Sequence, residues 1–419
     1  MIKKLAVFLI LLLAFGTVLY AQEDNLTLKI AVIGPGDELY FWWGHIALII
    51  EDSSVNQSYF FDYGIFDFRQ DNFFYNFAFG RLLYTCGVSY AERNINIYKM
   101  TNRDIIIYTL DLSPDVKSMI RDLASENILP ENKDYYYHHF DDNCSTRIRD
   151  IIDLATDGQF KKQFESEISQ FTLRGHVRRH TYFSPLEDWA LNFWMGQVID
   201  NPISVWAAMF LPSEVGKSIE NFTYIDRNGE ERKLVTSVEV LNTSVKRPPV
   251  LEKPRKQWLI QLIFSLILSA VFYFFFYLYS KNKQEGRILA GFSISLCGLV
   301  FGAVSLLLYF MNLFTNHDYT FQNMNMIFCS PLLLVTVPFG IRYALTKDIK
   351  KIFVCDQIIR IIWLLTVLGI IISMILNLLP WFYQDNLTDQ LLMLPIALVF
   401  SLRPYGLKEI LLKWGFYGK

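Results

Sequence analysis

Hydrophobic and polar positions divide the chain into two parts of different character. Up to about residue 257, short apolar stretches alternate with polar connections, as in a domain with a core on one side and water on the other. After Trp258, long apolar runs dominate. Residues 245–257 lie between the two parts and are rich in proline and charge, a composition that cannot sustain a helix or a strand. The pattern therefore predicts two structural units joined by a linker.

The first 21 residues have the pattern of an export signal. Lys3 and Lys4 precede an apolar run at 5–19, and the small residue Ala21 comes before a polar flank. A basic start, a short apolar stretch and a small residue are typical of a signal peptide that is cleaved. An uncleaved first membrane span is the alternative. On both interpretations, residues 22–244 lie outside the cytoplasm.

The exported part, residues 22–244, has the pattern of an α+β domain with an antiparallel sheet. Apolar runs at 45–50 and 58–63 flank a polar connection and predict a hairpin. Ser113 and Pro114 are typical N-cap and first-turn residues of a helix, expected to continue to about residue 124. Apolar residues three and four apart after Cys144 predict a second helix that begins at this cysteine. Further strands are expected at 26–33, 81–90 and 103–112.

The C-terminal part contains apolar runs close to the ~20 residues that cross a bilayer. They lie at 258–279, 288–311, 326–345, 358–380 and 391–407. Lys and Arg occur in alternate connections and in the tail at 408–419, whereas the connections 312–323 and 381–390 contain neither. Cation-rich connections stay in the cytoplasm. We therefore expect an all-α transmembrane bundle of about five helices at 258–407, with a cytoplasmic tail at 408–419.

Composition and charge narrow the range of partners. The 419 residues carry a formal net charge of −2, so nothing in the global electrostatics recommends nucleic acid as a partner. Aromatic residues make up 16% of the chain, more than an ordinary soluble core uses. We expect the membrane, and not nucleic acid, to be a partner.

Cys144 is the strongest candidate for chemistry. In the first turn of a helix, a thiol lies at the positive end of the helix dipole and near unpaired N–H groups, which favours the thiolate. Arg147, about one turn later, adds positive potential. His45 is a suitable base because imidazole exchanges protons near neutral pH. If the hairpin turn is centred on residues 53–54, Asp62 lies directly across from His45 and orients its ring.

Other interpretations of the same residues remain open. A lone cysteine is most often a small buried hydrophobe. In an oxidising periplasm, Cys86 and Cys144 could form a disulfide, which would abolish the nucleophile. A hairpin shifted by one residue would pair His45 with Phe61 or Tyr63 instead of Asp62.

Several short motifs carry a resemblance to a known family. They are Trp43-Gly44-His45, Asp62-Tyr63-Gly64, Gly80-Arg81, Asn143-Cys144-Ser145-Thr146-Arg147, and His317 with Asn325. With these motifs the chain resembles the Lnb family of bacterial membrane proteins, which combine a periplasmic thiol domain with several C-terminal spans. The order of histidine first and Asn-Cys later is also similar to that of circularly permuted papain-like thiol enzymes.

The resemblance implies lipoprotein N-acylation at the bacterial inner membrane, by a multi-pass protein whose N-terminal domain is periplasmic. An acyl chain would leave a phospholipid donor, rest on Cys144 as a thioester, and pass to the N-terminal amine of a lipoprotein acceptor. His45, Cys144 and Asp62 would be catalytic. Asn143, or the N–H of Cys144, would stabilise the oxyanion, with Arg147 as local support. No cofactor is implied.

Trp43, Arg81, His317 and Asn325 are expected on the lipid or membrane side of this site. For His317, a purely local hydrogen-bonding role is the alternative. The basic stretch 174–180 would bind a phospholipid headgroup or form a solvated surface. We predict no metal, because His138-His139 has no cysteine or carboxylate at a recognised ligand spacing.

Two other classes of function compete with acyl transfer. The first is a membrane-anchored cell-wall peptidase or amidase of NlpC type, since related thiol folds cleave wall peptides. The second is a non-catalytic membrane scaffold, in which neither Cys144 nor His45 would be needed.

Overall fold

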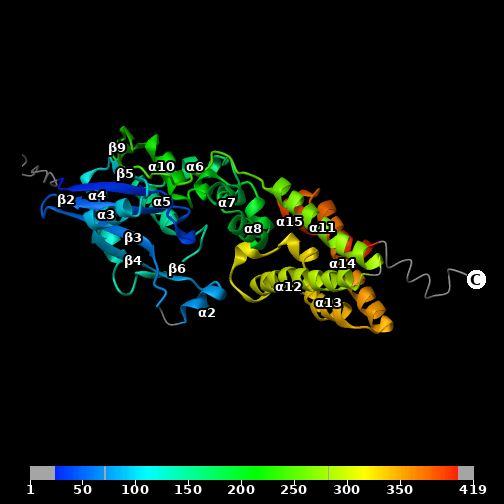
Figure 1. The fold of residues 1–419 in the computed structure, drawn as a ribbon. Coiled ribbons are helices and arrows are strands. Elements are labelled where there is room, and N and C mark those ends of the chain that lie inside the picture. Colours follow the sequence, from blue (N-terminus) through cyan, green and yellow to red (C-terminus); the bar gives the residue numbers. More distant parts are fainter. Residues whose placement is uncertain (1–23, 70–71, 282, 404–419) are drawn as a thin grey trace, which may run out of the picture. The chain divides into compact units, whose positions relative to one another are not determined.

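The computed structural model describes residues 24–69, 72–281 and 283–403 (Figure 1). The expected export signal at 1–21, the tail at 408–419 and the end of the fifth expected span lie outside the described residues. The chain forms two compact units. The sheet unit comprises the chain up to Phe66, Tyr84–Phe164 and Met209–Val245, and the membrane unit comprises Asp67–Leu83, Glu165–Ala208 and the chain from Lys246 onward.

A seven-stranded sheet forms the centre of the sheet unit, with the strand order β6-β4-β3-β2-β1-β5-β9. The strands are β1 (Leu26–Ile33), β2 (His45–Asp52), β3 (Gln57–Ile65), β4 (Leu83–Tyr90), β5 (Ile105–Leu110), β6 (Asp134–Tyr136) and β9 (Val235–Asn242). The pairs β1–β2, β2–β3, β3–β4, β1–β5 and β5–β9 are antiparallel. The expected antiparallel sheet is therefore confirmed, and β1 has the bounds that its apolar alternation predicts.

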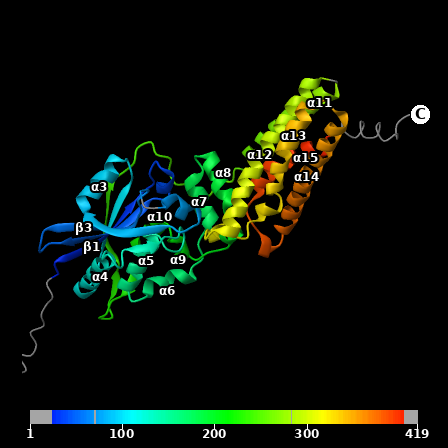
Figure 2. The same ribbon diagram turned by 90° about the horizontal axis from the view of Figure 1, so that it is seen from below.

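Helices cover both faces of this sheet. The face that carries Ala47, Ile49 and Phe60 packs on α3 (Ala91–Met100). The helices α4 (Pro114–Asn127) and α5 (Cys144–Ala155) pack against β1, β2 and β3, and in Figure 2 α3 lies on the opposite side of the sheet from them. Because both faces are covered, β2 is buried at five consecutive positions instead of alternating.

Smaller elements complete the sheet unit. They are η1 (Leu39–Phe41), α6 (Gln159–Ser166, which continues into the membrane unit), α10 (Pro212–Glu220), and the two-stranded sheet of β7 (Thr223–Ile225) and β8 (Glu231–Lys233). The helix α10 contacts α5 and β1. Its Gly216 lies against the Tyr108 ring of β5, where a Cβ would come within 3.0 Å of the hydroxyl oxygen. The expected α+β architecture is thus present in this unit.

Among the described residues of the membrane unit, three helices are long and apolar enough to cross a bilayer. They are α11 (Trp258–Ser280), α12 (Gln284–Phe314) and α14 (Ile349–Leu376). Two shorter apolar helices accompany them: α13 (Thr336–Leu345), preceded by the 3-10 turn η5 (Pro331–Val335), and α15 (Leu387–Leu402). The third expected span, 326–345, is therefore a broken helix that begins with the 3-10 turns η4 (Met324–Ile327) and η5.

Two excursions from the N-terminal part belong to the membrane unit. The first contains the short helix α2 (Phe73–Ala78). The second contains α7 (Leu173–Thr181), α8 (Pro185–Trp194), η2 (Gln197–Asp200) and α9 (Val205–Ala208). The remaining short turns are η3 (Asp318–Thr320) and η6 (Pro380–Phe382).

The second excursion packs against one end of the helix bundle. The indole N–H of Trp194 donates to Val304 O of α12, Arg178 pairs with Asp385 between α14 and α15, and Gln257 before α11 donates to Asp188. Asp385 lies in the connection 381–390, which contains neither Lys nor Arg. The charge pattern and the packing therefore agree on which end of the bundle is exported.

Candidate active site

The hairpin of β2 and β3 brings His45 and Asp62 together. Asp62 pairs across the ladder with Ala47, two residues along from His45, so the expectation that it lies directly opposite His45 is wrong by two residues. An even shift keeps both side chains on the same face. His45 Nε2 consequently lies 2.8 Å from Asp62 Oδ1.

The two-residue difference between the expected and the observed hairpin register arises in the turn. Residues 53–56 form the connection, and Asn56 adopts a left-handed conformation with φ 48°, which asparagine tolerates better than most residues. The turn is thus centred on residues 54–55 instead of 53–54. Its start is fixed by Asp52, whose carboxylate accepts a hydrogen bond from the Ser54 N–H at 2.9 Å.

The surroundings of His45 favour its protonated form. Burial is the largest influence and lowers the pKa of His45, but Asp62, Tyr98 and Cys144 together raise the pKa well above its ordinary value. Tyr98 of α3 lies beside the imidazole, with ring centroids 6.3 Å apart. Because Nε2 is bonded to Asp62, Nδ1 is the nitrogen left for exchanging a proton with a reacting group.

Cys144 is the first residue of α5, as its sequence context predicts. Asn143 is the N-cap, and its side-chain oxygen accepts from the Ser145 N–H at 2.8 Å and the Thr146 N–H at 3.0 Å. The Thr146 hydroxyl in turn accepts from the Asn143 N–H, which completes a capping box. This cap fixes the direction of the first turn and therefore the position of the thiol.

The donors of Asn143 are all used in holding the chain. Its side-chain amide donates to the carbonyl oxygens of His139 at 2.7 Å and Phe210 at 3.0 Å. Of the two roles that the sequence leaves open for Asn143, the geometry fits local support and leaves no donor for an oxyanion. The N–H of Cys144 itself has no hydrogen-bond partner among the described residues and remains available.

Arg147 supports the loop that precedes Cys144. Its guanidinium makes two hydrogen bonds to the Asp142 carboxylate, at 2.6 and 2.8 Å, and lies 4.1 Å from the Tyr135 ring centroid. The planar, two-pronged pairing fixes the loop geometry more firmly than a single contact would.

Gly64, two residues beyond Asp62, places Cys144 next to the end of β3. A Cβ at Gly64 would lie 3.6 Å from Cys144 Cβ, 3.6 Å from Tyr137 Cε2 and 3.9 Å from the Tyr135 hydroxyl. Gly64 has φ 94°, a conformation that glycine adopts at little cost. The thiol is half-buried and free.

Tyr135 and Tyr137, which lie near the thiol, are a part of the site that sequence reasoning missed. The rings of Tyr84 and Tyr137 stack with centroids 4.1 Å apart. Burial is the main cause that raises the pKa of Tyr84 to about 12, with a further contribution from Cys144. The Tyr135 hydroxyl is buried without a hydrogen-bond partner among the described residues. The run Tyr135-Tyr136-Tyr137, shortly upstream of Cys144, is the signal that could have revealed them, because the first and third side chains of an extended segment point to the same side.

Cys86 takes no part in a disulfide with Cys144, since all five cysteines are described and all are free. Burial is the main cause that raises the pKa of Cys86 to about 12, and Asp62 raises it further. A thiol in this environment stays protonated and inert.

A cleft of about 420 Å³ lies on the flank of α5, lined by Tyr63, Asn127, Asp142, Arg147, Asp150 and Leu154. Neither His45 nor Cys144 lines it. Within the described residues, no group of three or more His, Cys, Asp or Glu side chains is placed to hold a metal ion.

His317 and Asn325 belong to the membrane unit and are fully engaged there. His317 Nε2 donates to Phe77 O at 3.0 Å, and its Nδ1 accepts from the Tyr319 hydroxyl at 2.9 Å. Burial is the main cause that lowers the pKa of His317, in keeping with a neutral ring. The Asn325 amide donates to Phe193 O at 2.9 Å and to Asp389 Oδ2 at 3.1 Å. This geometry fits the local hydrogen-bonding role left open for His317.

Trp43 and Arg81 have different settings. Trp43 precedes β2, and its indole N–H is buried without a hydrogen-bond partner among the described residues. Arg81 is exposed, with its guanidinium 6.0 Å from the centroid of the Phe79 ring.

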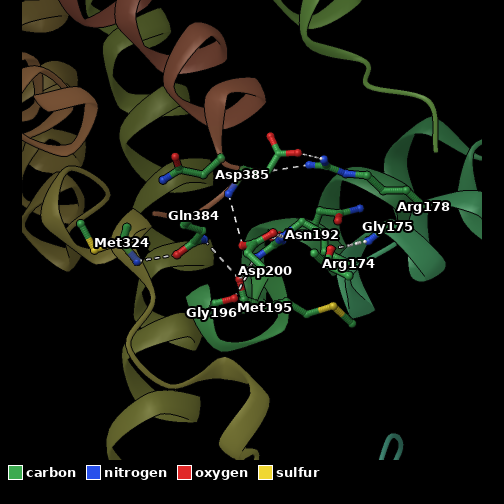
Figure 3. A network of polar contacts seen from close by, with 12 residues as sticks. Arg174, Gly175, Arg178, Asn192, Met195, Gly196, Asp200, Met324, Gln384 and Asp385 are labelled. Carbon is green, nitrogen blue, oxygen red and sulfur yellow. Dashed lines mark hydrogen bonds and ion pairs between the residues drawn. The ribbon is translucent and has the colours of Figure 1, made fainter. Parts of the chain in front are cut away.

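The basic stretch 174–180 is neither a solvated surface nor a headgroup site. Its five basic side chains are buried in α7. Arg174 donates to Asp200 Oδ1 at 2.8 Å and to the carbonyl oxygens of residues 192, 195 and 196, and Arg178 pairs with Asp385 Oδ2 at 2.5 Å (Figure 3). Both expectations are therefore wrong, because the partners of these cations come from the chain itself.

The fold and the site define a class: a membrane protein with an α+β domain in which a free thiol at a helix start lies near an imidazole–carboxylate pair. Residues 20–189 match the family described as the Lnb N-terminal periplasmic domain. This match covers β1 to the start of α8, including His45, Asp62 and Cys144. No curated protein and no solved structure matches the chain. The family match and the three candidate spans support an inner-membrane protein with a periplasmic N-terminal domain.

Proposed function

We propose that this protein is a thiol-dependent lipoprotein N-acyltransferase. The observation that carries the proposal is the pairing of His45 with Asp62 beside a free, half-buried Cys144, in a chain with candidate membrane spans and an Lnb-like periplasmic domain. We further propose that the sheet unit is a permuted papain-like fold, because the thiol begins a helix that packs on the strand bearing the imidazole.

In the first half-reaction, the sulfur of Cys144 attacks the carbonyl carbon of a phospholipid acyl ester. A C–S bond forms and the C–O ester bond breaks. The lysophospholipid leaves as an alcohol after taking a proton from His45, and the acyl chain remains as a thioester. Asp62 keeps the imidazole oriented and stabilises its charged form. The unused N–H of Cys144 is a suitable donor to the oxyanion.

In the second half-reaction, the N-terminal amine of the lipoprotein attacks the thioester carbonyl. A C–N bond forms, the C–S bond breaks, and His45 takes the proton that the amine loses. The products are the N-acylated lipoprotein and the original thiol. A thioester is reactive enough for an amine to displace it, so one sulfur can serve two bulky substrates in turn. No cofactor is required for either step.

The test is mass spectrometry of the N-terminal peptide of a resident lipoprotein, from cells with the native chain and cells with Cys144→Ser. The native chain should yield the N-acylated peptide, and the variant should yield the free amine. Cys86→Ser is the matched control because that thiol is buried and inert, and it should leave acylation intact. N-acylated peptide in cells that carry only Cys144→Ser would overturn the proposal. Loss of wall-peptide cleavage instead of acylation would favour a peptidase.

A further inference from the structure

The short helix α2 (Phe73–Ala78) exposes an unusual amount of aromatic surface. Its sequence Phe-Phe-Tyr-Asn-Phe-Ala contains no charge, and no residue in it is buried. The exposed fractions are 75% for Phe74, 57% for Tyr75 and 47% for Phe77. Phe68, at 50%, packs edge-on against Phe73. A contiguous exposed aromatic patch of this kind marks an interaction surface.

A six-residue helix cannot persist in water without tertiary contacts, and α2 is fixed to the exported end of the candidate span α12. The backbone N–H of Asn316 donates to Phe79 O at 2.9 Å, and His317 holds Phe77 O. Phe79 packs edge-on against Phe310 of α12, with centroids 5.4 Å apart. These contacts involve the backbone of α2, the ring of Phe77 and the C-terminal flank, so the rings of Phe74 and Tyr75 remain exposed.

Gly80 makes this close approach possible. It has φ 70°, and a Cβ there would lie 2.8 Å from the carbonyl carbon of Asn316 and 2.9 Å from the His317 nitrogen. The two backbones therefore touch directly. The result is a rigid attachment of α2 beside the last turn of α12.

The aromatic surface is continuous with a surface that faces lipid. At the end of α12, next to the Phe310 contact, Leu313 is 61% exposed and Phe314 is 67% exposed, as expected of a helix in hydrocarbon. The connection that follows, 315–323, carries neither Lys nor Arg and belongs on the exported side. Aromatic rings at this level are typical of the boundary between headgroups and acyl chains.

We propose that α2 inserts its exposed aromatic rings into the outer leaflet of the inner membrane. Phe74 and Tyr75 lie among the upper parts of the acyl chains, and the exposed Arg81 lies at the level of the phosphates, where its charge is favourable. The same excursion joins β3, which carries Asp62 and Gly64, to β4. Resting on the proposed function, this insertion places the segment that joins β3 to β4 among the lipids that supply the acyl donor.

Site-specific photocrosslinking tests the insertion. The photoreactive residue p-benzoylphenylalanine replaces Phe74 in the full-length chain, which is reconstituted in nanodiscs of phosphatidylethanolamine and phosphatidylglycerol. Irradiation followed by intact mass analysis should show a phospholipid adduct. The lipid control is Leu299, which is 51% exposed in α12, and the water control is Tyr136, which is 71% exposed in β6.

The expected adduct yield at position 74 is close to that at position 299 and at least about fivefold above that at position 136. Adducts at position 299 without adducts at position 74 would overturn the proposal, as would a protein adduct at position 74 in place of lipid. The whole series is repeated with Cys144→Ala. Insertion does not depend on the thiol, so crosslinking succeeds or fails independently of acyl transfer.

Discussion

Two polar centres among the described residues, one around Cys144 and one around Arg174, are built in opposite ways. In the membrane unit, the Arg174 guanidinium makes hydrogen bonds to one carboxylate and three carbonyl oxygens, and its side chain is 1% exposed. Around Cys144, the thiol is half-buried, the Cys144 N–H is unused, and the Tyr135 hydroxyl has no partner among the described residues.

This difference distinguishes polar groups that stabilise the fold from polar groups that are available for a reaction. A buried polar group whose nitrogen and oxygen atoms all have hydrogen-bond partners stabilises one arrangement of the chain. It has no atom left to bind a substrate. Unused donors beside a nucleophile have a free-energy cost in the folded state, and such strain is typical of functional sites. His45 and His317 illustrate the contrast, because one imidazole keeps Nδ1 for exchange while the other has both nitrogens engaged.

The largest expected effect is a difference in acylation rate between variants of these two histidines. His45→Gln should lower N-acylation by on the order of 10²–10⁴-fold, because the proton shuttle is lost. His317→Gln, the matched control, should change the stability of the α2 attachment but not the chemical step. Single-turnover acylation by the two purified full-length variants measures the contrast. Equal losses of acylation rate in the two variants would show that the assignment of a catalytic role to His45 and a structural role to His317 is wrong.

Breaking the Arg174 centre should affect stability before it affects chemistry. Arg174→Met leaves Asp200 buried and uncompensated, which costs about 3–5 kcal/mol for a buried pair. The control is Arg121→Met, which removes an exposed pair with Asp122 and should cost less than about 1 kcal/mol. Thermal unfolding in detergent, followed by tryptophan fluorescence, gives both values. An unchanged midpoint for Arg174→Met would contradict the assignment of a structural role.

Asp62→Asn probes the charge that acts on His45. Asp62 raises the pKa of His45, so its loss should move the His45 limb of the pH–rate profile to lower pH. A raised pKa in the folded state gives stability that is fully present below the unfolded value of about 6.5 and is lost as the pH rises through the folded value. The stability difference between the native chain and Asp62→Asn should therefore shrink as the pH rises. A pH-independent difference would exclude this charge coupling.

The smallest expected effect concerns Gly64. Alanine at φ 94° is strained by on the order of 1 kcal/mol, although its methyl group would meet Cys144 at an ordinary contact distance of 3.6 Å. Gly64→Ala should lower the unfolding midpoint slightly and slow acylation, because relief of the backbone strain shifts the end of β3 that contacts Cys144. Gly158→Ala is the control, because Gly158 also has positive φ but no atom within 4 Å of its Cβ position. If both variants acylate equally, Gly64 does not position the thiol.

Local patterns predicted the elements that carry the site. The apolar alternation of β1 and the onset of α5 at Cys144 both match the structure. The hairpin register was missed by two residues, because Asn56 tolerates a left-handed conformation that the adjacent serines did not signal. A register shift of two residues changes the cross-strand partner of a residue but keeps its side chain on the same face of the sheet. The face was therefore predicted correctly although the partner was not.

Long-range contacts explain what the sequence could not show. Arg174 pairs with a carboxylate 26 residues away, and Arg178 pairs with one 207 residues away. The local sequence therefore shows only a run of basic residues without their partners. The same holds for α2, whose attachment to residues 316–317 depends on the backbone approach at Gly80. Tyr98 lies beside His45 only because α3 crosses the face of the sheet.

The most direct measurement is the intact mass of the full-length protein after one turnover with phospholipid and no lipoprotein. The account predicts a gain of one acyl chain on Cys144, removed by hydroxylamine and then transferred to an added lipoprotein amine. Cys144→Ala should gain nothing. A protein that acylates the lipoprotein while its Cys144 never carries an acyl chain would contradict the central claim.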